Sequence, residues 1–425
     1  HLMGWVTDLH PTESELAACV QCGLCLPHCP TYRLTGLDTA SPRGRLMAMS
    51  AVAAGSLPVD DSFADIMGFC LQCRACEAVC PSLVPFGRAM EGARAEVAVQ
   101  VSDPTRSVRQ LLLGRGLGTP AVMRLATFAI RALRFLGLGG LLPRSMSAPL
   151  TGIRPLERRP PLRGQTWGRP TRGTAALLAG CVMEPWFGGV QQATMNLLVR
   201  AGYQVTVPVD QTCCGALAAH DGAADQARRL ARQNLTALAG VDLVVATAAG
   251  CSAHLAEYGN WVEGGEELAS RSRDVTIVVA DLIEQGLLPR LEQGRGPVAV
   301  QDPCHLRHAQ RQTRGSRLIA EAAGYQPVDV DPSGMCCGAA GIYSLRHPEA
   351  STELGRRKAA EVNATGSTLV VSANPGCEMQ LRQYLDDWFR ILHPIELYHD
   401  ALPPDLSFFV PHEPSERGNG PGEAG

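Results

Sequence analysis

The feature that most constrains this chain is its cysteine content, which falls into four groups of four. The sequence has sixteen cysteines in 425 residues, too few for a small disulfide-held scaffold and too many for incidental core packing. The groups are Cys19, Cys22, Cys25 and Cys29; Cys70, Cys73, Cys76 and Cys80; Cys181, Cys213, Cys214 and Cys251; and Cys304, Cys336, Cys337 and Cys377. Each group therefore needs a chemical role in the folded chain.

The first two groups both have the spacing CxxCxxCxxxCP. Two-residue gaps let three thiolates wrap one corner of an iron-sulfur cube, while the fourth cysteine, followed by proline, turns toward the other cluster. We therefore expect one 4Fe-4S cluster on Cys19, Cys22, Cys25 and Cys80, and a second on Cys70, Cys73, Cys76 and Cys29. Zinc is the alternative, although zinc sites favour two CxxC pairs over a fourfold run that ends in proline.

The last two groups repeat one pattern, because three of their cysteines recur after an interval of 123 residues. In each copy an adjacent pair is followed by glycine, so the pair can hold two corners of a metal centre from a single turn. Each copy thus offers a four-thiolate site made by Cys181, Cys213, Cys214 and Cys251, or by Cys304, Cys336, Cys337 and Cys377. An iron-sulfur cluster, a structural zinc, a redox-active disulfide and inert core thiols all remain open.

Several polar residues near these cysteines are candidates for secondary roles. His305 directly follows Cys304 and is the best placed of them to touch a centre, as a hydrogen-bond donor or proton partner, although a packed or surface histidine explains it somewhat better. Ordinary packing explains the other candidates better still, and these are His220, His254, Asp302, His308 and Glu184.

The loops of the first two groups add two further expectations. Gly23 and Ala75 leave room for the backbone to approach inorganic sulfide, where amide hydrogen bonds tune the potential. Arg43 and Arg45 either place positive charge beside the clusters or are ordinary residues at the start of a helix.

The expected architecture is an α+β multidomain chain, in which an α-helical ferredoxin-like domain precedes two homologous α/β lobes. Short β-branched runs alternate with helical stretches in both lobes, a pattern typical of parallel sheets. The predicted divisions are residues 1–103 for the two-cluster domain, 104–172 for a basic helical connector, 173–290 and 291–402 for the lobes, and 403–425 for a flexible tail.

The connector carries thirteen arginines and one acidic residue, Glu157. Within it Arg124, Arg131 and Arg134 fall on one face of a predicted helix, which would suit a membrane surface or a partner groove. A helix packed on its own protein with a solvated basic face explains the pattern equally well. No apolar run long enough to span a bilayer and no leader pattern is found, so we expect a cytoplasmic protein, peripheral at most on the inner face of the membrane.

Missing motifs narrow the function further. The sequence has no GxGxxG after a strand and no GxxxxGK[ST], GxSxG or HExxH pattern, so no dinucleotide, nucleotide or hydrolytic metal site is recognisable. A net charge of -3 argues against nucleic acid as a partner. We therefore assign the chemistry to the cysteine sites and expect no catalytic residue for substrate oxidation in this chain.

The order of these parts resembles the iron-sulfur subunits of glycolate oxidase (glycolate dehydrogenase). The stretches that carry the resemblance are Cys19 to Tyr32, Ser41 to Arg45, Cys213 to Ala216, Ala249 to Cys251, Cys304 to Gln310 and Cys336 to Gly341. The resemblance implies a hetero-oligomer in which a separate FAD-binding subunit oxidises glycolate to glyoxylate, and often D-lactate. It also implies that this chain passes the electrons toward the respiratory chain, at a membrane or quinone contact.

Two other families share these parts. The repeated cysteine pattern also resembles heterodisulfide reductase, where each motif ends in CxxC, but here the endings are Cys251 to His254 and Cys377 to Gln380. Without the fifth cysteine, an unusual cluster and disulfide-reductase chemistry should not be carried over. The iron-sulfur subunit of anaerobic glycerol-3-phosphate dehydrogenase remains an alternative, as do a zinc-stabilised assembly protein and a thiol-disulfide oxidoreductase.

Overall fold

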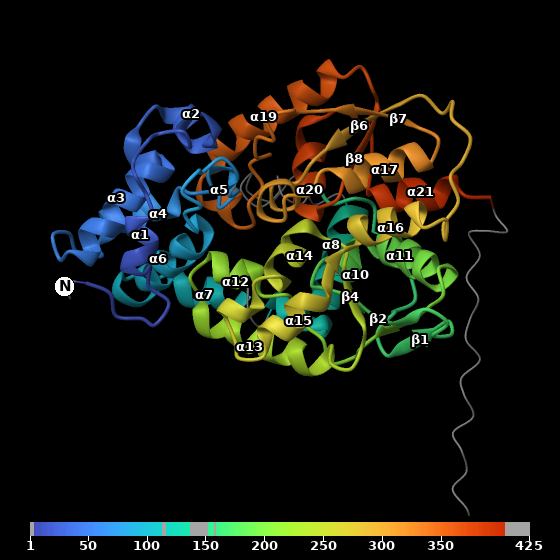
Figure 1. Cartoon of the computed structure of the whole chain (residues 1–425), viewed down its shortest axis with the longest axis horizontal. Coiled ribbons are helices and arrows are strands. Elements are labelled where there is room, and N and C mark those ends of the chain that lie inside the picture. The colour runs from blue at the N-terminus through green and yellow to red at the C-terminus, as the bar shows by residue number, and fades with distance from the viewer. Residues whose placement is uncertain (1–3, 113–115, 137–151, 157–158, 404–425) are drawn as a thin grey trace, which may run out of the picture.

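The N-terminal part of the chain folds into short helices around the first two cysteine groups. The computed structural model describes all residues except 1–3, 113–115, 137–151, 157–158 and 404–425. Between residues 4 and 103 it contains helices and no strand, in agreement with the sequence prediction. The helices, which Figure 1 shows gathered at one end of the molecule, are α1 (Glu13–Ala17), α2 (Pro30–Thr35), α3 (Pro42–Ala53), α4 (Asp61–Gly68), α5 (Ala75–Ala78) and α6 (Phe86–Gln100).

Capping residues set the starts of these helices. The Thr12 and Glu15 side chains form a capping box at α1, and the Ser41 hydroxyl accepts a hydrogen bond from the Gly44 amide at the start of α3. The Asp60 carboxylate accepts a hydrogen bond from the Phe63 amide at the start of α4. The apolar faces of these helices then pack on one another through Met49, Phe63, Met67 and Met90, which form a buried cluster together with several cysteines.

The connector supplies two helices and an edge strand, namely α7 (Arg106–Leu111), α8 (Pro120–Phe135) and β1 (Gln165–Trp167). Strand β1 pairs antiparallel with β3 (Tyr203–Val207) of the following lobe, so part of the predicted connector belongs to a sheet. Residues 137–151 of the predicted connector lie outside the described residues, as does almost all of the predicted tail. No helix in the described part of the chain has both the length and the apolar character needed to cross a membrane.

Helix α8 exposes both arginines and apolar side chains. Arg131 Nη2 donates to the Leu156 carbonyl at 2.7 Å, and Arg134 Nη2 donates to the Ile153 carbonyl at 2.7 Å. Arg124 and Arg134 are nevertheless exposed, and Leu125 and Phe128 are exposed by 69% and 67%. The predicted arginine face is therefore present, but two of its members also bind connector carbonyls, and apolar side chains share the exposed surface.

The C-terminal half contains two parallel sheets of matching topology. The first has the order β1-β3-β2-β4-β5 and the second the order β7-β6-β8-β9, so β3-β2-β4-β5 matches β7-β6-β8-β9. All pairings except β1 with β3 are parallel. The strands are β2 (Gly173–Leu178), β3 (Tyr203–Val207), β4 (Leu243–Ala246) and β5 (Ser272–Asp274), then β6 (Pro297–Gln301), β7 (Gln326–Asp329), β8 (Leu369–Ser372) and β9 (Arg390–Leu392).

Helices connect these strands and cover the sheets. In the first lobe they are α10 (Met183–Trp186), α11 (Gly188–Arg200), α12 (Ala216–His220), α13 (Ala224–Ala237), α14 (Ala249–Leu255), α15 (Gly265–Arg271) and α16 (Val275–Glu284). In the second they are α17 (Arg314–Ala322), α18 (Tyr343–Arg346), α19 (Pro348–Ala364), α20 (Pro375–Tyr384) and α21 (Pro394–Ala401), preceded by a single π-helical turn η6 (His305–Ala309).

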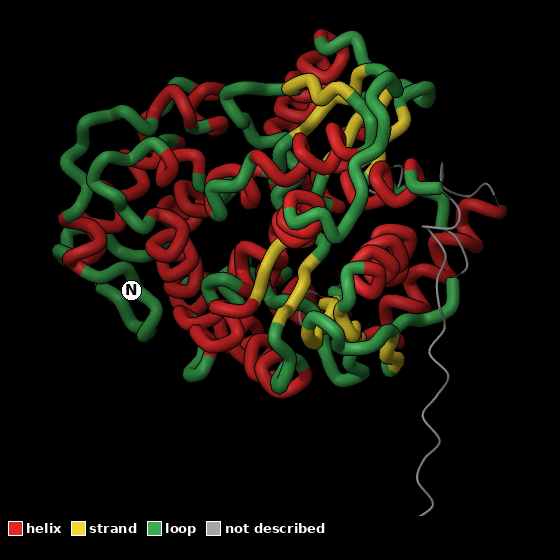
Figure 2. The backbone as a smooth tube through the Cα atoms, turned by 45° about the vertical axis from the view of Figure 1, so that its right-hand side comes forward, coloured by secondary structure: helices red, strands yellow, loops and turns green. Residues whose placement is uncertain are grey.

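A layer of four helices lies between the two sheets and belongs to both lobes. Helices α16 and α17 pack on each other, and α21 packs on both α11 and α17. Their apolar side chains join one buried cluster with the first sheet, in which Val279, Ile319 and Tyr398 are fully buried. Figures 1 and 2 show the strands of the two lobes on opposite sides of these helices. The hydrophobic core is therefore continuous across the two lobes.

Candidate functional site

The first cysteine site combines the early loop with a cysteine from the second group. Cys19, Cys22, Cys25 and Cys80 line one hollow, together with Cys76 at its inner edge. Cys22 is exposed to solvent, and burial raises the pKa of the Cys25 thiol to about 11. A thiolate at Cys25 therefore needs a cation beside it, which a bound metal centre supplies.

The second cysteine site lies deeper in the same domain. Cys70, Cys73 and Cys76 line a second hollow together with Cys29. Burial raises the pKa of the Cys73 and Cys76 thiols well above their usual range. The last cysteine of each run, the one followed by proline, thus lies beside the first three cysteines of the other run. Cys80 joins the first site, and Cys29 joins the second.

A buried cation borders this second hollow. Arg45 is 1% exposed, and its guanidinium donates to the Thr31 hydroxyl at 3.2 Å and to the Ile66 carbonyl at 3.0 Å. No carboxylate in the described part of the chain forms an ion pair with it. A buried guanidinium without a counter-charge is costly, and a cluster with four thiolates is the anion that would offset it. Arg43, in contrast, borders the first hollow and pairs with Asp38 at 3.0 Å.

The two cysteine loops share an unusual backbone. Gln21 and Gly23 flank Cys22 with φ angles of 57° and 81°, and Gln72 and Arg74 flank Cys73 with φ angles of 50° and 61°. Left-handed residues turn successive amide groups toward one side, which lets them point at sulfide. Arg74, and not the predicted Ala75, is the structural counterpart of Gly23, because Ala75 already begins α5.

The third site forms where three parallel strands of the first lobe end. Cys181 follows β2, Cys213 and Cys214 follow β3, and Cys251 lies on α14 after β4. The Cys214 and Cys251 sulfurs are 3.3 Å apart, and interaction with Cys213 raises the pKa of the Cys181 thiol well above its usual range. Gly215 adopts a φ of 98°, which the tight turn after the cysteine pair requires.

The fourth site repeats this arrangement in the second lobe. The Cys337 and Cys377 sulfurs are 3.3 Å apart, and Cys304 and Cys336 supply the other two thiols. His305 Nδ1 lies 3.5 Å from the Cys304 sulfur, so His305 touches the site. Interactions among the thiols lower the pKa of Cys304 and of Cys337 and raise the pKa of Cys336 and of Cys377, so protonation is shared unequally within the set.

The other predicted polar residues have different surroundings. Asp302 accepts hydrogen bonds from Arg307 and Arg317, and His308 Nε2 lies 2.8 Å from the Gly334 carbonyl oxygen, so both maintain the fold. Glu184 pairs with Arg163 at 2.6 Å. These three residues do not touch the thiols of their lobes, although Glu184 lies only three positions after Cys181.

His254 lies against the third site, and its ring nitrogens have no hydrogen-bond partner among the described residues. The residue is 3% exposed. A Cβ atom at Gly215 would lie 3.3 Å from His254 Nε2, so the ring borders the turn that carries the cysteine pair. Burial lowers its pKa to about 4, which keeps the imidazole neutral at physiological pH. Gln380, its counterpart in the second lobe, donates to the Ser351 carbonyl and hydroxyl.

A polar cluster that sequence reasoning missed joins the three parts of the chain. Arg74 pairs with Glu257 of the first lobe, His220 Nδ1 lies 3.1 Å from Glu91 Oε1, and the His220 and His305 rings are 5.5 Å apart. These partners are separated by 85 residues or more in the sequence, and no local pattern links them.

The second site of the N-terminal domain adjoins the fourth site. Helix α5 packs on η6, and Cys73 and Cys336 belong to one buried cluster with Leu71 and Tyr343. The lobes in turn meet at their thiol sites, where the Gly250 amide donates to the Asn374 side chain at 3.3 Å, and the Asn374 Nδ2 donates to the Cys377 sulfur. The four sites therefore form a series that runs through the interior from the exposed Cys22.

Comparison with known proteins identifies the family. The chain is 33% identical over 422 residues to the "Probable glycolate oxidase iron-sulfur subunit" of Bacillus subtilis (strain 168), a match that covers 92% of this chain and 94% of that protein. This chain belongs to the glycolate oxidase iron-sulfur subunit family. The family member of Escherichia coli (strain K12) is 32% identical over 396 residues, covering 89% of this chain and 94% of its own length. The resemblance predicted from the motifs is confirmed.

Two domain families account for the cysteine sites of this member of the glycolate oxidase iron-sulfur subunit family. Residues 15–84 match the 4Fe-4S dicluster domain, and residues 175–256 and 298–382 each match the cysteine-rich domain named CCG. The internal repeat is therefore a pair of CCG domains. "Lactate utilization protein A" of Shouchella clausii (strain KSM-K16) is 26% identical over 214 residues, which is 48% of this chain and 89% of that protein.

The donor sets of this chain suit the clusters that the 4Fe-4S dicluster domain implies. All sixteen cysteines are free thiols, and the deepest of them have raised pKa values that a bound cation would offset. Arg45 places a buried positive charge beside the second site, as an anionic cluster requires. Bound there, a 4Fe-4S cluster takes up and releases single electrons, while the chain fixes its position and surroundings.

Proposed function

We propose that this chain is the electron-transfer subunit of a flavin-dependent dehydrogenase that oxidises glycolate and D-lactate. The observation that carries the proposal is the series of four thiol sites, which begins at the exposed Cys22 and continues through both CCG domains. The names of the relatives support the substrate class, because two are glycolate oxidase iron-sulfur subunits and one is a lactate utilization protein. Substrate oxidation itself belongs to a partner subunit that holds FAD.

We assign the N-terminal clusters to crossed cysteine sets. Cys19, Cys22, Cys25 and Cys80 hold the first cluster, and Cys70, Cys73, Cys76 and Cys29 hold the second. The lining of the two hollows supports this assignment, since each contains three cysteines of one run and the proline-flanked cysteine of the other. Arg45 and the left-handed backbone at Gln72 and Arg74 stabilise the reduced, more negative state of the second cluster.

Each CCG domain also holds an iron-sulfur cluster in this proposal. Cys181, Cys213, Cys214 and Cys251 are the ligands in the first lobe, and Cys304, Cys336, Cys337 and Cys377 are the ligands in the second. The burial of Cys73 and Cys336 in one cluster supports a redox role for the lobes, because a zinc site would interrupt the series.

The flavin subunit docks over the first cluster. Val20, Leu24 and Leu83 are large, exposed apolar side chains, and they lie in the loops that carry the first thiol site. An apolar rim around an exposed ligand is the composition of a protein interface core. Electrons enter at this rim and leave through the lobes.

The exposed side of α7 and α8 contacts the inner face of the cytoplasmic membrane. Val108, Leu111 and Leu112 at α7 are exposed, as are Leu125 and Phe128 of α8. Arg124 is exposed on the same helix, so the surface combines apolar side chains with positive charge, as anionic lipid headgroups require. The complex would thereby deliver electrons to a lipid-soluble acceptor.

The deciding experiment measures iron, sulfide and zinc in anaerobically purified protein, followed by reduction through a co-purified flavin subunit. Two clusters in the first domain predict about eight iron atoms, and filled lobes predict about sixteen. Adding glycolate or D-lactate to the complex should bleach the visible iron-sulfur absorption. About eight iron atoms with one or two zinc ions would make the lobes docking modules, and iron near zero would overturn the proposal.

A further inference from the structure

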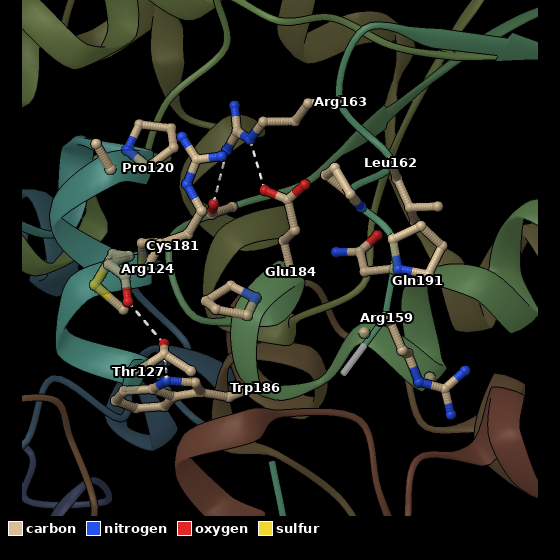
Figure 3. A pocket seen from close by; sticks show the side chains of 18 of the residues that line it. Pro120, Arg124, Thr127, Arg159, Leu162, Arg163, Cys181, Glu184, Trp186 and Gln191 are labelled. Atoms are coloured by element: carbon tan, nitrogen blue, oxygen red, sulfur yellow. Dashed lines mark hydrogen bonds and ion pairs between the residues drawn. The ribbon is translucent and has the colours of Figure 1, made fainter. Parts of the chain in front are cut away.

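The third thiol site has an open side and a closed side. On the open side Cys181 lines a cavity of about 930 Å³ between α8 and the first lobe, which Figure 3 shows together with the pair of Arg163 and Glu184. On the closed side the adjacent cysteines Cys213 and Cys214 are 2% and 3% exposed. A group that contacts a bound centre on the closed side is therefore expected to come from the protein and not from bulk water.

His254 borders this closed side. It lies on α14 three residues after Cys251, and its Nε2 would be 3.3 Å from a Cβ atom placed on Gly215, the residue that follows the cysteine pair. The imidazole packs against the rings of Tyr258 and Trp261, whose centroids are 5.5 Å and 5.6 Å away. These aromatic neighbours restrict the orientation of the ring, in which Nε2 faces the turn at Gly215.

Hydrogen bonds tie the cysteine pair to the segment that carries His254. The Tyr258 hydroxyl donates to the Cys214 carbonyl at 2.6 Å, and the Asn234 side chain donates to the Cys213 carbonyl at 3.0 Å. Asn234 Nδ2 also donates to the Tyr258 hydroxyl at 3.0 Å. Because Tyr258 directly follows α14, the thiol pair keeps a fixed position relative to the imidazole.

The ring nitrogens of His254 lack the partners that buried polar groups need. Neither nitrogen has a hydrogen-bond partner among the described residues, although the residue is only 3% exposed. Burial lowers its pKa to about 4, so the ring is neutral and has one N–H to donate. A buried donor without an acceptor costs free energy, and nearly all such groups in folded proteins are paired. The fold therefore holds an unpaired donor beside a set of four thiols.

The second lobe has a paired side chain at the equivalent place. Gln380 lies three residues after Cys377, and its Nε2 would be 3.4 Å from a Cβ atom placed on Gly338, the glycine after the other cysteine pair. That nitrogen donates to the carbonyl and the hydroxyl of Ser351. Both lobes thus bring a side-chain nitrogen to the same point of the motif, and the two nitrogens differ in whether the protein itself supplies an acceptor.

We propose that His254 Nε2 donates a hydrogen bond to the iron-sulfur centre of the first lobe and thereby raises its reduction potential. The inference rests on the proposed function, because it needs a cluster on the four thiols of the third site. Reduction adds one electron, and thus one negative charge, to the centre, and a hydrogen-bond donor stabilises this state more than the oxidised state. The proton stays on the ring. His254 therefore favours residence of the electron in the first lobe, at the centre whose ligand Cys181 lines the cavity.

The first test compares two substitutions of His254. His254→Phe removes the donor and keeps a flat ring, whereas His254→Gln keeps a side-chain nitrogen that can reach the turn, as Gln380 does in the second lobe. Redox titration followed by electron paramagnetic resonance measures the potentials, and the signal that Cys214→Ser removes identifies the centre. His254→Phe should shift the one-electron equilibrium of this centre at least tenfold toward oxidation, a fall of about 59 mV in its potential. His254→Gln should shift it less, and the other centres should keep their potentials in both variants.

A second test detects the hydrogen bond in the wild-type protein. With ¹⁵N-labelled histidine, the signal of the first-lobe centre should show a weak coupling to nitrogen, which His254→Gln should remove. A coupling that persists in His254→Gln would come from another histidine and would overturn the inference. A strong coupling, as given by nitrogen bound directly to iron, would overturn it in favour of His254 as a ligand.

The outcomes separate the inference from the function on which it rests. If His254→Phe retains both its iron and its potential, the inference is wrong and the proposed function stands. If His254→Phe does not load this centre, the nitrogen coupling of the wild-type protein decides, and its absence refutes the hydrogen bond. If the first lobe of the wild-type protein binds zinc or no metal, the inference fails together with the proposed iron-sulfur centre of that lobe.

Discussion

Arg74, in the loop of the second cysteine site, forms a partly buried ion pair with Glu257 of the first CCG domain. The same guanidinium donates to Glu77 at 2.7 Å, so one side chain both braces the cluster loop and anchors it to the lobe. Arg74 adopts a φ of 61°, a conformation that glycine would take more easily. The side chain is therefore retained at a backbone position that costs free energy, and its contacts offset that cost.

Removing the Glu257 charge should loosen the attachment of the N-terminal domain. We expect Glu257→Gln to lower the free energy of unfolding by about 1–3 kcal/mol, since it leaves a partly buried guanidinium short of one partner. Differential scanning calorimetry of cluster-loaded protein measures the effect. Glu263→Gln, at an exposed position of the same lobe, is the matched control and should change the transition little. Equal transitions for both variants would show that the pair contributes nothing.

The crossed ligand assignment predicts that two single substitutions act on different clusters. Cys80→Ser should remove the first cluster and Cys29→Ser the second, each with a loss of about four iron atoms per chain. Electron paramagnetic resonance of the reduced proteins should show a different missing signal in each variant. Loss of the same signal in both variants would contradict the exchange of the proline-flanked cysteines.

Arg45 should raise the reduction potential of the second cluster, because reduction adds negative charge next to a buried cation. We expect Arg45→Met to lower this potential by on the order of 60 mV, a tenfold change for a one-electron couple. Redox titration followed by electron paramagnetic resonance measures the change. Arg43→Met is the control and should have a smaller effect, since Arg43 already pairs with Asp38. An unchanged potential in Arg45→Met, with iron content retained, would argue against an anionic cluster at Cys29.

The exposed apolar side chains of α8 should drive membrane association. We expect the double variant Leu125→Gln with Phe128→Gln to bind anionic vesicles at least tenfold more weakly, because each buried apolar side chain contributes about 1.5–3 kcal/mol. Co-sedimentation with vesicles that contain phosphatidylglycerol measures binding. Leu37→Gln with Leu57→Gln changes two exposed leucines of the N-terminal domain and serves as the control. Equal sedimentation of both double variants would show that lipid does not contact this helix.

His393 should make the protein less stable in acid. Burial, together with the nearby positive charge of Arg154, lowers its pKa to about 3, whereas an unfolded histidine titrates near pH 6.5. Below pH 6.5 the unfolded state binds more protons, so stability falls with pH by about 1.4 kcal/mol per unit until the folded pKa is reached. His393→Asn keeps a side-chain acceptor for the Ile395 amide, which His393 Nδ1 now provides at the start of α21.

The difference in stability between wild type and His393→Asn is the quantity to measure, because all other groups titrate in both proteins. Between pH 6.5 and 5.0 wild type should lose about 2 kcal/mol relative to the variant. Urea unfolding at the two pH values gives this difference. Parallel pH dependence of the two proteins would mean that His393 is not held neutral by the fold.

The spacing of the cysteines predicted the family and most of the fold. The runs of β-branched residues predicted β2, β3, β4, β6, β7 and β8. Strands β2, β4, β6 and β8 are mostly apolar and buried, whereas β3 and β7 are partly exposed and have mixed sequences. Strands β5 and β9 were missed. The sequence of β5 is Ser272, Arg273 and Asp274, which has no apolar pattern, and it is a strand only because β4 pairs with it.

Several side-chain contacts depend on residues far apart in the sequence, and local sequence patterns do not predict them. The arginines of α8 lie in a regular helical pattern, but only the position of the connector carbonyls shows that Arg131 and Arg134 bind backbone. His254 is three residues after Cys251 on one helix, which a helical pattern does place on the same side as the thiol site. The contacts of Arg74 with Glu257, and of His220 with Glu91 and His305, depend on three separate parts of the chain meeting, and no local signal predicts them.

The helical layer between the two sheets means that neither CCG domain is an autonomous folding unit. Val279 of α16 and Ile319 of α17 lie in one core, so a chain cut near residue 290 would leave an apolar face of α16 in water. The two lobes should therefore unfold together as one cooperative unit, although each lobe has its own sheet and its own set of four thiols. Loss of a centre in one half therefore weakens the scaffold around the other.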